Sequence, residues 1–243
     1  MNDSKNSMLR LHVFPHQWDF NPSPFCLKVE TYCRLAGIAM TSVPALPFRA
    51  PRGKLPFLED GEERIPDSGL IIEHLKGRFG DLDGALDARQ AAIGHLLRRT
   101  CEESLYFVFI YSRWIDPEGW RVVKPAFFGS LPPLARDAAA AMARRGVRGA
   151  LYAQGYGRHT RDGIYAIGAA DLAAIAVTIA GRAYAVADAQ TSFDASLYGI
   201  LANILAAPVE TALKREARRH PTLVAYVERM GMRLAEAAEP SKL

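Results

Sequence analysis

The hydrophobic periodicity of this 243-residue chain changes once, near residue 80. Before that point, short runs of apolar residues alternate with polar ones, as in strands that bury one face. Beyond it, apolar residues recur at the three-to-four-residue spacing of helices. A chain of this length suits two domains, each with its own core. We therefore predict a small α/β domain over residues 1–80 and an all-helical domain over residues 85–243.

Short strands and helices alternate in the first 80 residues. Ser23-Pro24 opens a helix, because serine caps a helix well and proline is tolerated in its first turn. Prolines between residues 44 and 53 disfavour a helix there. The predicted elements are a strand at 9–13, a helix from 24 to Gly37, a strand at 38–43, hairpin strands at 55–58 and 64–65, and a helix from Asp67-Ser68 to about Phe79.

The second part of the chain carries only helical patterns. The longest is predicted to run from residue 85 to 114. The others lie at about 131–154, 169–182, 193–206, 209–218 and 222–237. The last of these has a clean amphipathic stripe, which we interpret as core packing.

Composition excludes several functional classes. Hydrophobic residues make up 49% and charged residues 23% of the chain, a globular balance. The formal charge of +4 comes from scattered Lys and Arg residues, so we expect no nucleic-acid partner. Three cysteines and six histidines lack disulfide-framework or metal-ligand spacing. We therefore expect a reducing compartment and no metal.

The termini and apolar stretches bear on location. The N-terminal residues lack the apolar segment of a secretory signal, and the longest apolar stretch, 169–180, is too short to span a bilayer. We expect a cytoplasmic protein without a membrane anchor. The final Ser241-Lys242-Leu243 spells a peroxisomal address in a eukaryote, with a chance match as the alternative.

Four short motifs follow one another along the chain, and their order and spacing matter together. They are Ser23-Pro24-Phe25-Cys26, Lys54-Leu55-Pro56-Phe57-Leu58, Asp67-Ser68 before a helix, and Thr191-Ser192-Phe193-Asp194. With these motifs, the chain resembles the glutathione transferase superfamily over nearly its whole length. The resemblance implies a thioredoxin-like α/β N-terminal domain, an all-α C-terminal domain, glutathione as co-substrate and a homodimer.

Three further segments resemble a narrower branch, that of the metaxins and failed-axon-connections proteins. They are Ser23 through Tyr32, Gly53-Lys54-Leu55-Pro56, and Gln154 through His159. No helix is predicted between the strands at 38–43 and 55–58, and this missing second helix fits the branch as well.

Ser23 is the candidate catalytic residue. Glutathione transferases act through the thiolate of glutathione, and the resemblance places the catalytic Ser or Cys at this position. A hydroxyl and the backbone N–H groups at a helix N-terminus can both stabilise that anion. The alternative is that Ser23-Pro24 is simply a good helix start.

Phe25 and Cys26 follow Ser23, and we assign both to glutathione binding. The Ser23–Cys26 spacing resembles a thioredoxin C-x-x-C motif that has lost its first cysteine, so an internal dithiol cycle is excluded. Cys26 either has a pKa lowered by the helix terminus or packs in the core. Cys33 and Cys101 are interpreted as core residues.

The remaining candidate site residues are Lys54, Leu55, Pro56, Asp67 and Ser68. The resemblance implies a cis bond before Pro56, with the Leu55 backbone paired to the cysteinyl backbone of glutathione. It also implies Ser68 on the α-carboxylate of the γ-glutamyl group and Asp67 on its ammonium. Lys54 meets a ligand carboxylate or is simply solvated. Asp67-Ser68 is in any case an expected helix cap.

The helical part supplies candidates for binding an electrophile. They are Tyr106, Phe107, Phe109, Tyr111 and Trp114, for which core packing is the alternative. Thr191-x-x-Asp194 has the form of a capping box, so we assign it to folding.

Together these features predict an enzyme that conjugates the glutathione thiolate to a hydrophobic electrophile. The rival hypothesis is a non-catalytic, metaxin-like interaction module that retains the fold, since fold does not fix function. A related glutathione-dependent reduction or isomerisation is a third possibility, although the lack of Cys at position 23 opposes thiol–disulfide exchange.

Overall fold

The computed structural model describes residues 8–237, so the Ser241–Leu243 tripeptide lies outside the described residues. By packing, the chain divides into two compact units. The first contains the described residues up to Arg98, then Gly181–Asn203, then the described residues from Ala225; the second contains Arg99–Ala180 and Ile204–Val224. This division by packing differs from the predicted domain boundary between residues 80 and 85. That boundary remains a prediction from sequence.

A four-stranded sheet forms the base of the first unit, in the order β2-β1-β3-β4. Strand β1 pairs in parallel with β2, in antiparallel fashion with β3, and β3 pairs antiparallel with β4. The strands are β1 Arg10–Val13, β2 Thr41–Pro44, β3 Phe57–Asp60 and β4 Glu63–Pro66. This small mixed sheet fits the thioredoxin-like N-terminal domain that the resemblance implied.

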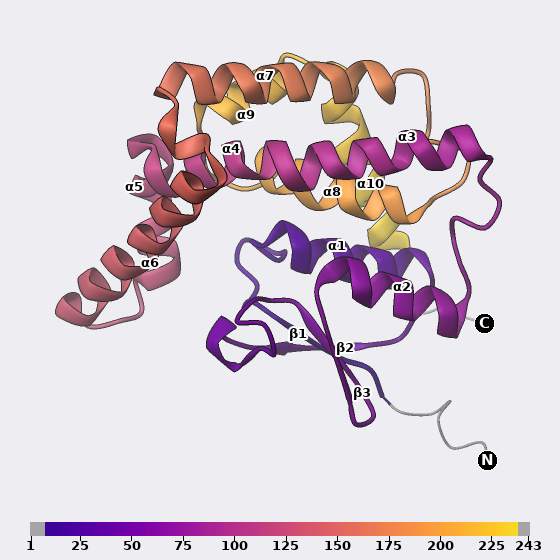
Figure 1. The fold of residues 1–243 in the computed structure, drawn as a ribbon, viewed down its shortest axis with the longest axis horizontal. Helices are drawn as coiled ribbons and strands as arrows, with labels where there is room; N and C mark the ends of the chain where they lie inside the picture. The colour runs from indigo at the N-terminus through magenta and orange to yellow at the C-terminus, as the bar shows by residue number, and fades with distance from the viewer. Residues whose placement is uncertain (1–7, 238–243) are drawn as a thin grey trace. The chain divides into compact units, whose positions relative to one another are not determined.

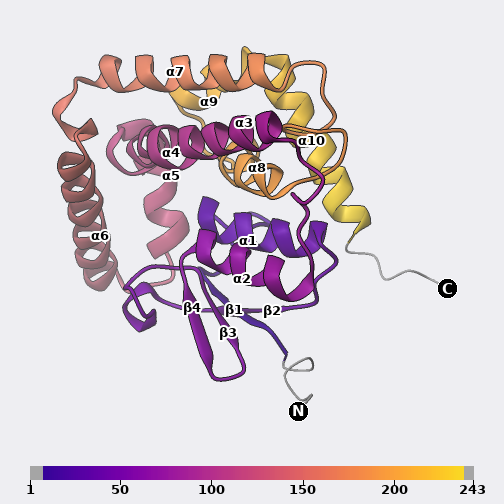
Figure 2. The ribbon, with the colours of Figure 1, turned by 45° about the vertical axis from the view of Figure 1, so that its right-hand side comes forward.

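Helices α1 (Pro24–Leu35) and α2 (Ser68–Phe79) lie side by side over one face of the sheet, as Figures 1 and 2 show. Their apolar faces and that of the sheet form one buried cluster. It includes Leu9, Leu11, Val13, Val29, Cys33, Leu58, Ile71 and Leu75. The alternation of residues 9–13 thus buries the face that the sequence predicted.

Three later helices complete the first unit: α3 (Ala88–Arg99), α8 (Ser192–Leu205) and α10 (Pro221–Glu236). Each of them extends slightly beyond the limits of the unit. Helix α8 crosses α1 closely, because a Cβ built on Gly199 would lie 2.6 Å from the Pro24 carbonyl oxygen. Ala195 of α8 belongs to the same buried cluster as the sheet. Residues from far along the chain therefore complete the packing around α1.

The second unit is helical throughout. It contains two π-helical segments, η2 (Thr100–Leu105) and η3 (Tyr111–Ile115), with α4 (Tyr106–Ile110) between them. Its other elements are α5 (Pro117–Phe128), α6 (Pro133–Gln154), the 3-10 turn η4 (Tyr156–Arg158), α7 (Arg161–Thr178) and α9 (Ala212–Arg218). Within the described part of the chain, no helix combines the length and apolar character needed to cross a membrane.

Several boundaries differ from the sequence prediction. Strand β2 begins three residues later than predicted, at Thr41. Helix α5 was not predicted, although Asp116 caps it and Pro117 occupies its first turn. Helix α7 begins at Arg161 rather than near 169, because Thr160 accepts the Gly163 N–H at 3.2 Å and starts the helix earlier. Between β2 and β3 there is only a 3-10 turn, Pro47–Arg49, as the prolines predicted.

Candidate functional site

The strand register brings two of the predicted site segments to one end of the sheet. His12 pairs with Phe57 in antiparallel fashion, and Phe57 pairs with Pro66. The end of β1, the start of β3 and the end of β4 therefore lie at the same end of the sheet. Leu55-Pro56 directly precedes Phe57, and Asp67-Ser68 directly follows Pro66, so the two pairs enter and leave the sheet at the same end.

Ser23 lies at the N-cap of α1, with extended backbone angles (φ −93°, ψ 120°). Its Oγ accepts the Cys26 backbone N–H at 3.4 Å, and its carbonyl accepts the Leu27 N–H at 2.9 Å. The predicted cap is confirmed. A serine hydroxyl that accepts in a cap also carries one proton to donate. Here the Ser23 side chain hydrogen-bonds to Cys26 as well, which acts to lower the pKa of that thiol.

Asn21 anchors Ser23 to the end of β1. The Asn21 Oδ1 accepts the Ser23 backbone N–H at 3.1 Å, and its Nδ2 donates to the Phe14 carbonyl oxygen at 2.9 Å. Asn203 of α8 donates from Nδ2 to the Asn21 carbonyl oxygen at 3.2 Å. Asn21 is fully buried. Sequence reasoning missed this positioning residue; the only local signal was an asparagine before Pro22 in a loop.

Cys26 is fully buried in the core beneath α1. Burial raises the pKa of its thiol to about 12, although hydrogen bonding to Ser23 and to the Phe14 backbone acts in the opposite direction. A thiol with this pKa is almost entirely protonated at neutral pH. The packing interpretation therefore holds for the side chain, and any part Cys26 plays toward a ligand falls to its backbone. Cys33 and Cys101 are buried as well, as predicted.

The peptide bond between Leu55 and Pro56 is cis, as the resemblance implied. Both residues are buried, while Lys54 beside them is exposed. Within the described residues, the Lys54 ammonium has no carboxylate partner. Leu55 lies beyond the last paired residue of β3, so its backbone is outside the sheet ladder.

Asp67 and Ser68 form the N-terminus of α2. The Asp67 Oδ1 accepts the backbone N–H groups of Gly69 at 2.8 Å and Leu70 at 3.4 Å, which confirms the cap. Asp67 has a φ of 73°, an unusual value for a residue with a side chain and one typical of functional sites. Asp67 is exposed and Ser68 is buried behind it. Within residues 8–237, nothing donates to the other carboxylate oxygen of Asp67.

The aromatic residues proposed for electrophile binding pack mainly against other rings of the second unit. Phe107 stacks on Tyr156 with ring centroids 5.6 Å apart, and Tyr111 meets Tyr165 edge-on at 5.9 Å. Phe109 is buried, and Trp114 stacks on Phe127 at 5.8 Å. The core interpretation accounts for these contacts.

Asp194 performs the folding role assigned to the capping box. Its carboxylate accepts the Thr191 backbone N–H at 2.9 Å and the Thr191 hydroxyl at 2.8 Å. It also accepts the Ala185 N–H at 2.7 Å and the Tyr226 hydroxyl at 2.9 Å. Four donors on one buried carboxylate tie the start of α8 to α10 and to the loop before α8. Among residues 8–237, no cluster of His, Cys, Asp and Glu is arranged to hold a metal ion.

Comparison with known proteins fits this arrangement. Residues 24–119 match the family described as glutathione S-transferase N-terminal domain, and residues 168–230 match glutathione S-transferase C-terminal domain. The chain is 32% identical over 233 residues to the isoprene-epoxide–glutathione S-transferase of Rhodococcus sp. (strain AD45), covering 92% of this chain and 98% of that protein. The chain belongs to the glutathione S-transferase superfamily.

Two other relatives place this superfamily member near the metaxin-like branch. It is 28% identical over 225 residues to Failed axon connections of Drosophila melanogaster, covering 86% of this chain and 53% of that protein. It is 23% identical over 185 residues to Metaxin-2 of Mus musculus, covering 75% of this chain and 70% of that protein. The chain thus spans about half the length of Failed axon connections.

Solved structures share the glutathione S-transferase fold. The β-etherase LigF of Sphingobium sp. strain SYK-6 superimposes with a TM-score of 0.64 at 18% identity, covering 95% of this chain and 98% of that one. A glutathione S-transferase of Methylobacterium radiotolerans, solved with glutathione sulfonate, gives a TM-score of 0.58 at 16% identity and covers 96% of this chain and 97% of that one. At these identities, the likeness concerns the fold alone.

Proposed function

We propose that the chain is a glutathione transferase that conjugates the glutathione thiolate to a hydrophobic electrophile. The observation that carries this proposal is Ser23 at the N-cap of α1, where a serine hydroxyl lies beside the backbone N–H groups of the first helical turn. The strand register adds support, because it sets Leu55-Pro56 and Asp67-Ser68 at one end of the sheet.

Ser23 stabilises the sulfur anion in this proposal. A free thiol has a pKa near 8.5, and each unit of downward shift requires about 1.4 kcal/mol of preference for the anion. The hydroxyl supplies a charge-assisted hydrogen bond, and the helix N-terminus supplies partial positive charge. Phe25 and Cys26 contribute the backbone of that first helical turn.

The remaining assigned residues hold the rest of the tripeptide. Leu55, next to Pro56, offers backbone groups outside the ladder, which pair with an extended ligand as an added strand would. Asp67 Oδ2 accepts from the ammonium of the γ-glutamyl group, and Ser68 at the start of α2 donates to its α-carboxylate. Lys54 meets a carboxylate of glutathione.

The reaction is nucleophilic substitution or ring opening. The thiolate lone pair forms a bond from sulfur to the electrophilic carbon, and the bond to the leaving group, or to the ring oxygen of an epoxide, breaks with its electron pair. The oxygen of an opened epoxide then takes a proton from water. The epoxide in the name of the Rhodococcus relative makes small epoxides a reasonable first substrate class.

We also propose that the boundary between the α/β domain and the helical domain lies between residues 80 and 85, that the protein forms a homodimer, and that it works in the cytoplasm. Homo-oligomers with twofold symmetry are the commonest assemblies of soluble proteins, and size-exclusion chromatography with light scattering tests the dimer.

A non-catalytic, metaxin-like interaction module is the second candidate. The similarity to Failed axon connections and Metaxin-2 favours it, because a shared fold carries different functions in different proteins. Under this alternative, the site residues remain as structural caps and the protein does not conjugate glutathione.

Two measurements separate the two candidates. One is glutathione binding by calorimetry, and the other is conjugation of a chromogenic aryl halide and of a small aliphatic epoxide. We expect wild type to bind and conjugate, and Ser23→Ala to lose about 100-fold or more in kcat/KM, as removal of one anion-stabilising donor typically costs. Ser23→Thr keeps the hydroxyl and should restore part of the rate. Ser130→Ala, at an exposed serine after α5, is the matched control.

Ser23→Ala also removes a cap, which costs about 1 kcal/mol of stability, so its folding is checked by circular dichroism and thermal melting. Ser23→Asp retains an acceptor for the cap and has no side-chain donor at neutral pH. If wild type does not bind glutathione, the interaction module is the remaining candidate. If Ser23→Asp conjugates as fast as wild type, Ser23 is not the residue that stabilises the thiolate.

A further inference from the structure

The α5–α6 hairpin, residues 117–154, is a part of the fold that the proposed function does not use. It lies within the second unit and, apart from its first three residues, between the two segments that match the family, 24–119 and 168–230. It contains none of the residues assigned to glutathione. In Figures 1 and 2, its connection between α5 and α6 lies at the end of α6 that is far from α7.

The hairpin carries the net charge of the whole chain. It contains six basic and two acidic residues, a formal charge of +4, which equals the formal charge of all 243 residues. The other 205 residues therefore sum to zero. Lys and Arg residues are scattered along the sequence, but their excess over acidic residues is confined to this segment. The basic residues are Arg121, Lys124, Arg136, Arg144, Arg145 and Arg148.

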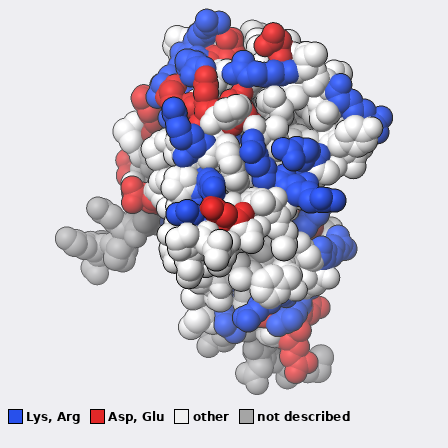
Figure 3. Space-filling view, turned by 90° about the vertical axis from the view of Figure 1, so that its left-hand side faces the viewer, with Lys and Arg blue, Asp and Glu red and all other residues white. Residues whose placement is uncertain are grey.

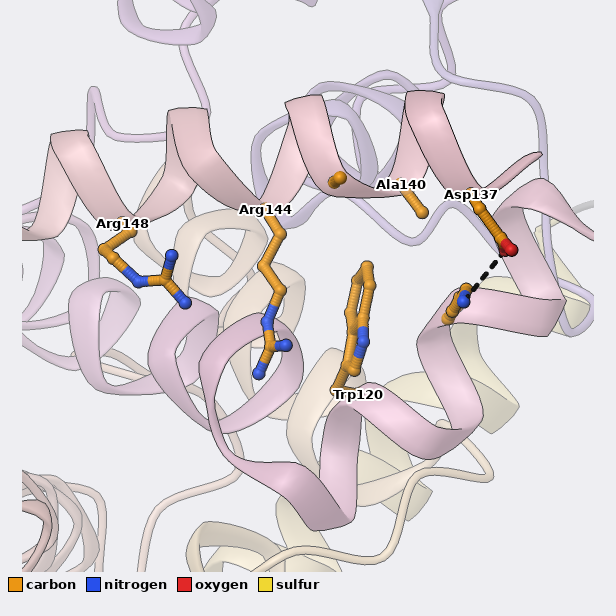
Figure 4. A pocket seen from close by; sticks show the side chains of 7 residues that line it. Trp120, Asp137, Ala140, Arg144 and Arg148 are labelled. Atoms are coloured by element: carbon orange, nitrogen blue, oxygen red, sulfur yellow. Dashed lines mark ion pairs between the residues drawn. The ribbon is translucent and has the colours of Figure 1, made fainter. Parts of the chain in front are cut away.

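Contacts between the two helices fix the hairpin. The Arg144 guanidinium of α6 lies 4.9 Å from the centre of the Trp120 ring of α5, and Figure 4 shows these side chains next to each other. Lys124 of α5 forms an ion pair with Asp137 of α6 at 3.0 Å, which the dashed line in Figure 4 marks. The hairpin is therefore a preformed element, and a partner that binds it has little ordering cost to overcome.

The two acidic residues of the hairpin do not neutralise its outer arginines. Asp137 is engaged by Lys124, and Glu118 forms an ion pair with Arg215 of α9 at 3.0 Å. Three exposed arginines of the hairpin form no ion pair with a carboxylate in the described part of the chain: Arg121, Arg145 and Arg148. Figure 3 views the molecule from the side on which α5 and α6 lie in Figure 1, and basic side chains run across that face with uncharged surface between them.

The outward face of α6 is also apolar. All 22 residues of α6 are described, and only Ala140 and Leu151 are buried. Away from these two, Leu134 is 89% exposed and Met142 is 76% exposed, and Leu131 in the connection before α6 is exposed as well. Large apolar side chains that gather on one exposed face mark a contact surface, whereas isolated ones do not.

Arginines and exposed aliphatic side chains on one face fit a membrane surface. Helices that lie on a bilayer place apolar side chains at the boundary of the acyl chains and basic side chains among the lipid phosphates. Nucleic acid would attract the arginines too, but it offers no apolar layer for Leu134 and Met142. The charge of the hairpin thus selects an anionic partner, and its exposed apolar residues select one with an apolar interior.

We propose that the α5–α6 hairpin docks on the surface of an anionic phospholipid bilayer. Leu131 and Leu134 enter the boundary between headgroups and acyl chains, and Arg145 and Arg148 bind lipid phosphates. Helix α6 lies along the surface. This docking is reversible and independent of glutathione, because no residue assigned to glutathione belongs to the hairpin.

Sedimentation of the full chain with vesicles tests the proposal. Vesicles of phosphatidylcholine containing about one third phosphatidylglycerol are compared with vesicles of phosphatidylcholine alone, at physiological and at high salt. We expect at least about tenfold tighter binding to the anionic vesicles, and weaker binding in high salt, which screens charge. Ser23→Ala should bind the vesicles as wild type does, so failure of this proposal and failure of the proposed function are distinguishable.

A double variant tests the role of the arginines. Arg145→Ala/Arg148→Ala should weaken binding to the anionic vesicles at least about tenfold, since each basic residue near such a surface contributes about fivefold in affinity. Arg49→Ala/Arg52→Ala is the matched control, because it removes two exposed arginines with the same spacing from the loop between β2 and β3. This control should bind almost as wild type does. Equal losses in the two double variants would reduce the effect to net charge and overturn the proposal.

Leu134 tests the apolar contact. Leu134→Ala should weaken vesicle binding about threefold or more, because less apolar surface leaves water. Leu96→Ala, at a leucine of α3 that is 65% exposed, is the matched control and should have no effect. A polarity-sensitive dye on Leu134→Cys should shift its emission to the blue when anionic vesicles are added, and the same dye on Leu96→Cys should not.

Three other results would overturn the proposal. The first is no binding to anionic vesicles, or binding that does not differ from that to neutral vesicles. The second is a blue shift of the dye on Leu134→Cys that needs no vesicles and grows with protein concentration, which would assign this face to a second copy of the chain. The third is binding of duplex DNA that Arg145→Ala/Arg148→Ala abolishes, with vesicle binding unaffected by Leu134→Ala, which would assign the face to nucleic acid.

Discussion

The side-chain oxygen of Asn21 accepts the backbone N–H of Ser23 at 3.1 Å. Through its Nδ2, the same side chain bonds to the carbonyl of Phe14, the residue after β1. The N-cap of α1 is therefore fixed to the end of the central strand by one buried amide. The position of the proposed catalytic hydroxyl depends on Asn21 as much as on the helix that Ser23 begins.

Replacing Asn21 should disturb the site without touching a ligand. Asn21→Ala leaves the Phe14 carbonyl and the Ser23 N–H without this partner, which costs about 1–3 kcal/mol of stability. We expect kcat for glutathione conjugation to fall, because Ser23 is no longer held, and Ser23→Ala to add little in the Asn21→Ala background. Urea unfolding and a double-mutant cycle on kcat/KM measure the two effects; full additivity would show that Asn21 does not act through Ser23.

The approach of α8 to α1 depends on the absence of a side chain at position 199. A Cβ there would lie 2.6 Å from the Pro24 carbonyl oxygen and 3.3 Å from the Lys28 nitrogen. Gly199→Ala should destabilise the protein by about 1–3 kcal/mol, as overpacking does, and weaken glutathione binding.

The matched control for that change is Gly146→Ala in α6, where a Cβ meets nothing within 4 Å. It should raise stability by up to about 1 kcal/mol, because alanine favours helix over glycine. Thermal melting of the two variants compares them directly. Equal stability of both would contradict the close packing of α8 on α1.

The three cysteines should be unreactive in the folded protein. All are buried, and burial raises the pKa of Cys26 and of Cys33 to about 12. An aromatic disulfide reagent should therefore label none of them rapidly at neutral pH and all three after unfolding in guanidinium. Rapid labelling of one native thiol, lost in Cys26→Ala, would restore the reactive interpretation of Cys26.

The same raised pKa values predict a loss of stability in alkali. Folding keeps these thiols protonated, whereas the unfolded thiols ionise from a pKa of 9.0. Their contribution is fully present below that pH and declines as pH rises toward about 12. Urea midpoints measured across this range should fall less steeply in Cys26→Ala than in wild type.

Asp194 should be the most sensitive single position for folding. Asp194→Ala leaves the donors of Thr191, Ala185 and Tyr226 unsatisfied in a buried site, which we expect to cost at least about 3 kcal/mol of stability.

The stability that Asp194 contributes should also depend on pH. Since burial raises the pKa of Asp194, this contribution to stability is fully present in acid and is reduced as pH rises through that pKa. Urea titrations at several pH values check both effects, and Thr222→Ala, on the partly exposed start of α10, serves as a control.

The sequence predicts α1 and α2, whose caps are local signals. Ser23 and Asp67 each accept a backbone N–H two or three residues ahead, so a short window contains the whole interaction. Thr160 caps α7 in the same way, but the glycines that follow it weaken the helical pattern at the start of that helix. Helix α5 was missed although Asp116 and Pro117 mark its beginning.

Features that depend on distant partners were beyond the sequence. Asn203 donates to the Asn21 backbone carbonyl oxygen from 182 positions away. Arg144 of α6 donates to the carbonyl oxygens of Trp114 and Ile115, which lie 30 and 29 positions away. No spacing rule connects such residues, because the fold alone brings them together.

The packing of α8 against α1 bears on how this protein is made. The first turn of α1 leaves the ribosome long before Gly199 and Asn203 are translated, so the nascent chain carries Ser23 for more than half of its synthesis without the helix that braces it. We infer that chains stalled before α8 lack the packing that holds the first turn of α1 and expose apolar surface to chaperones and proteases.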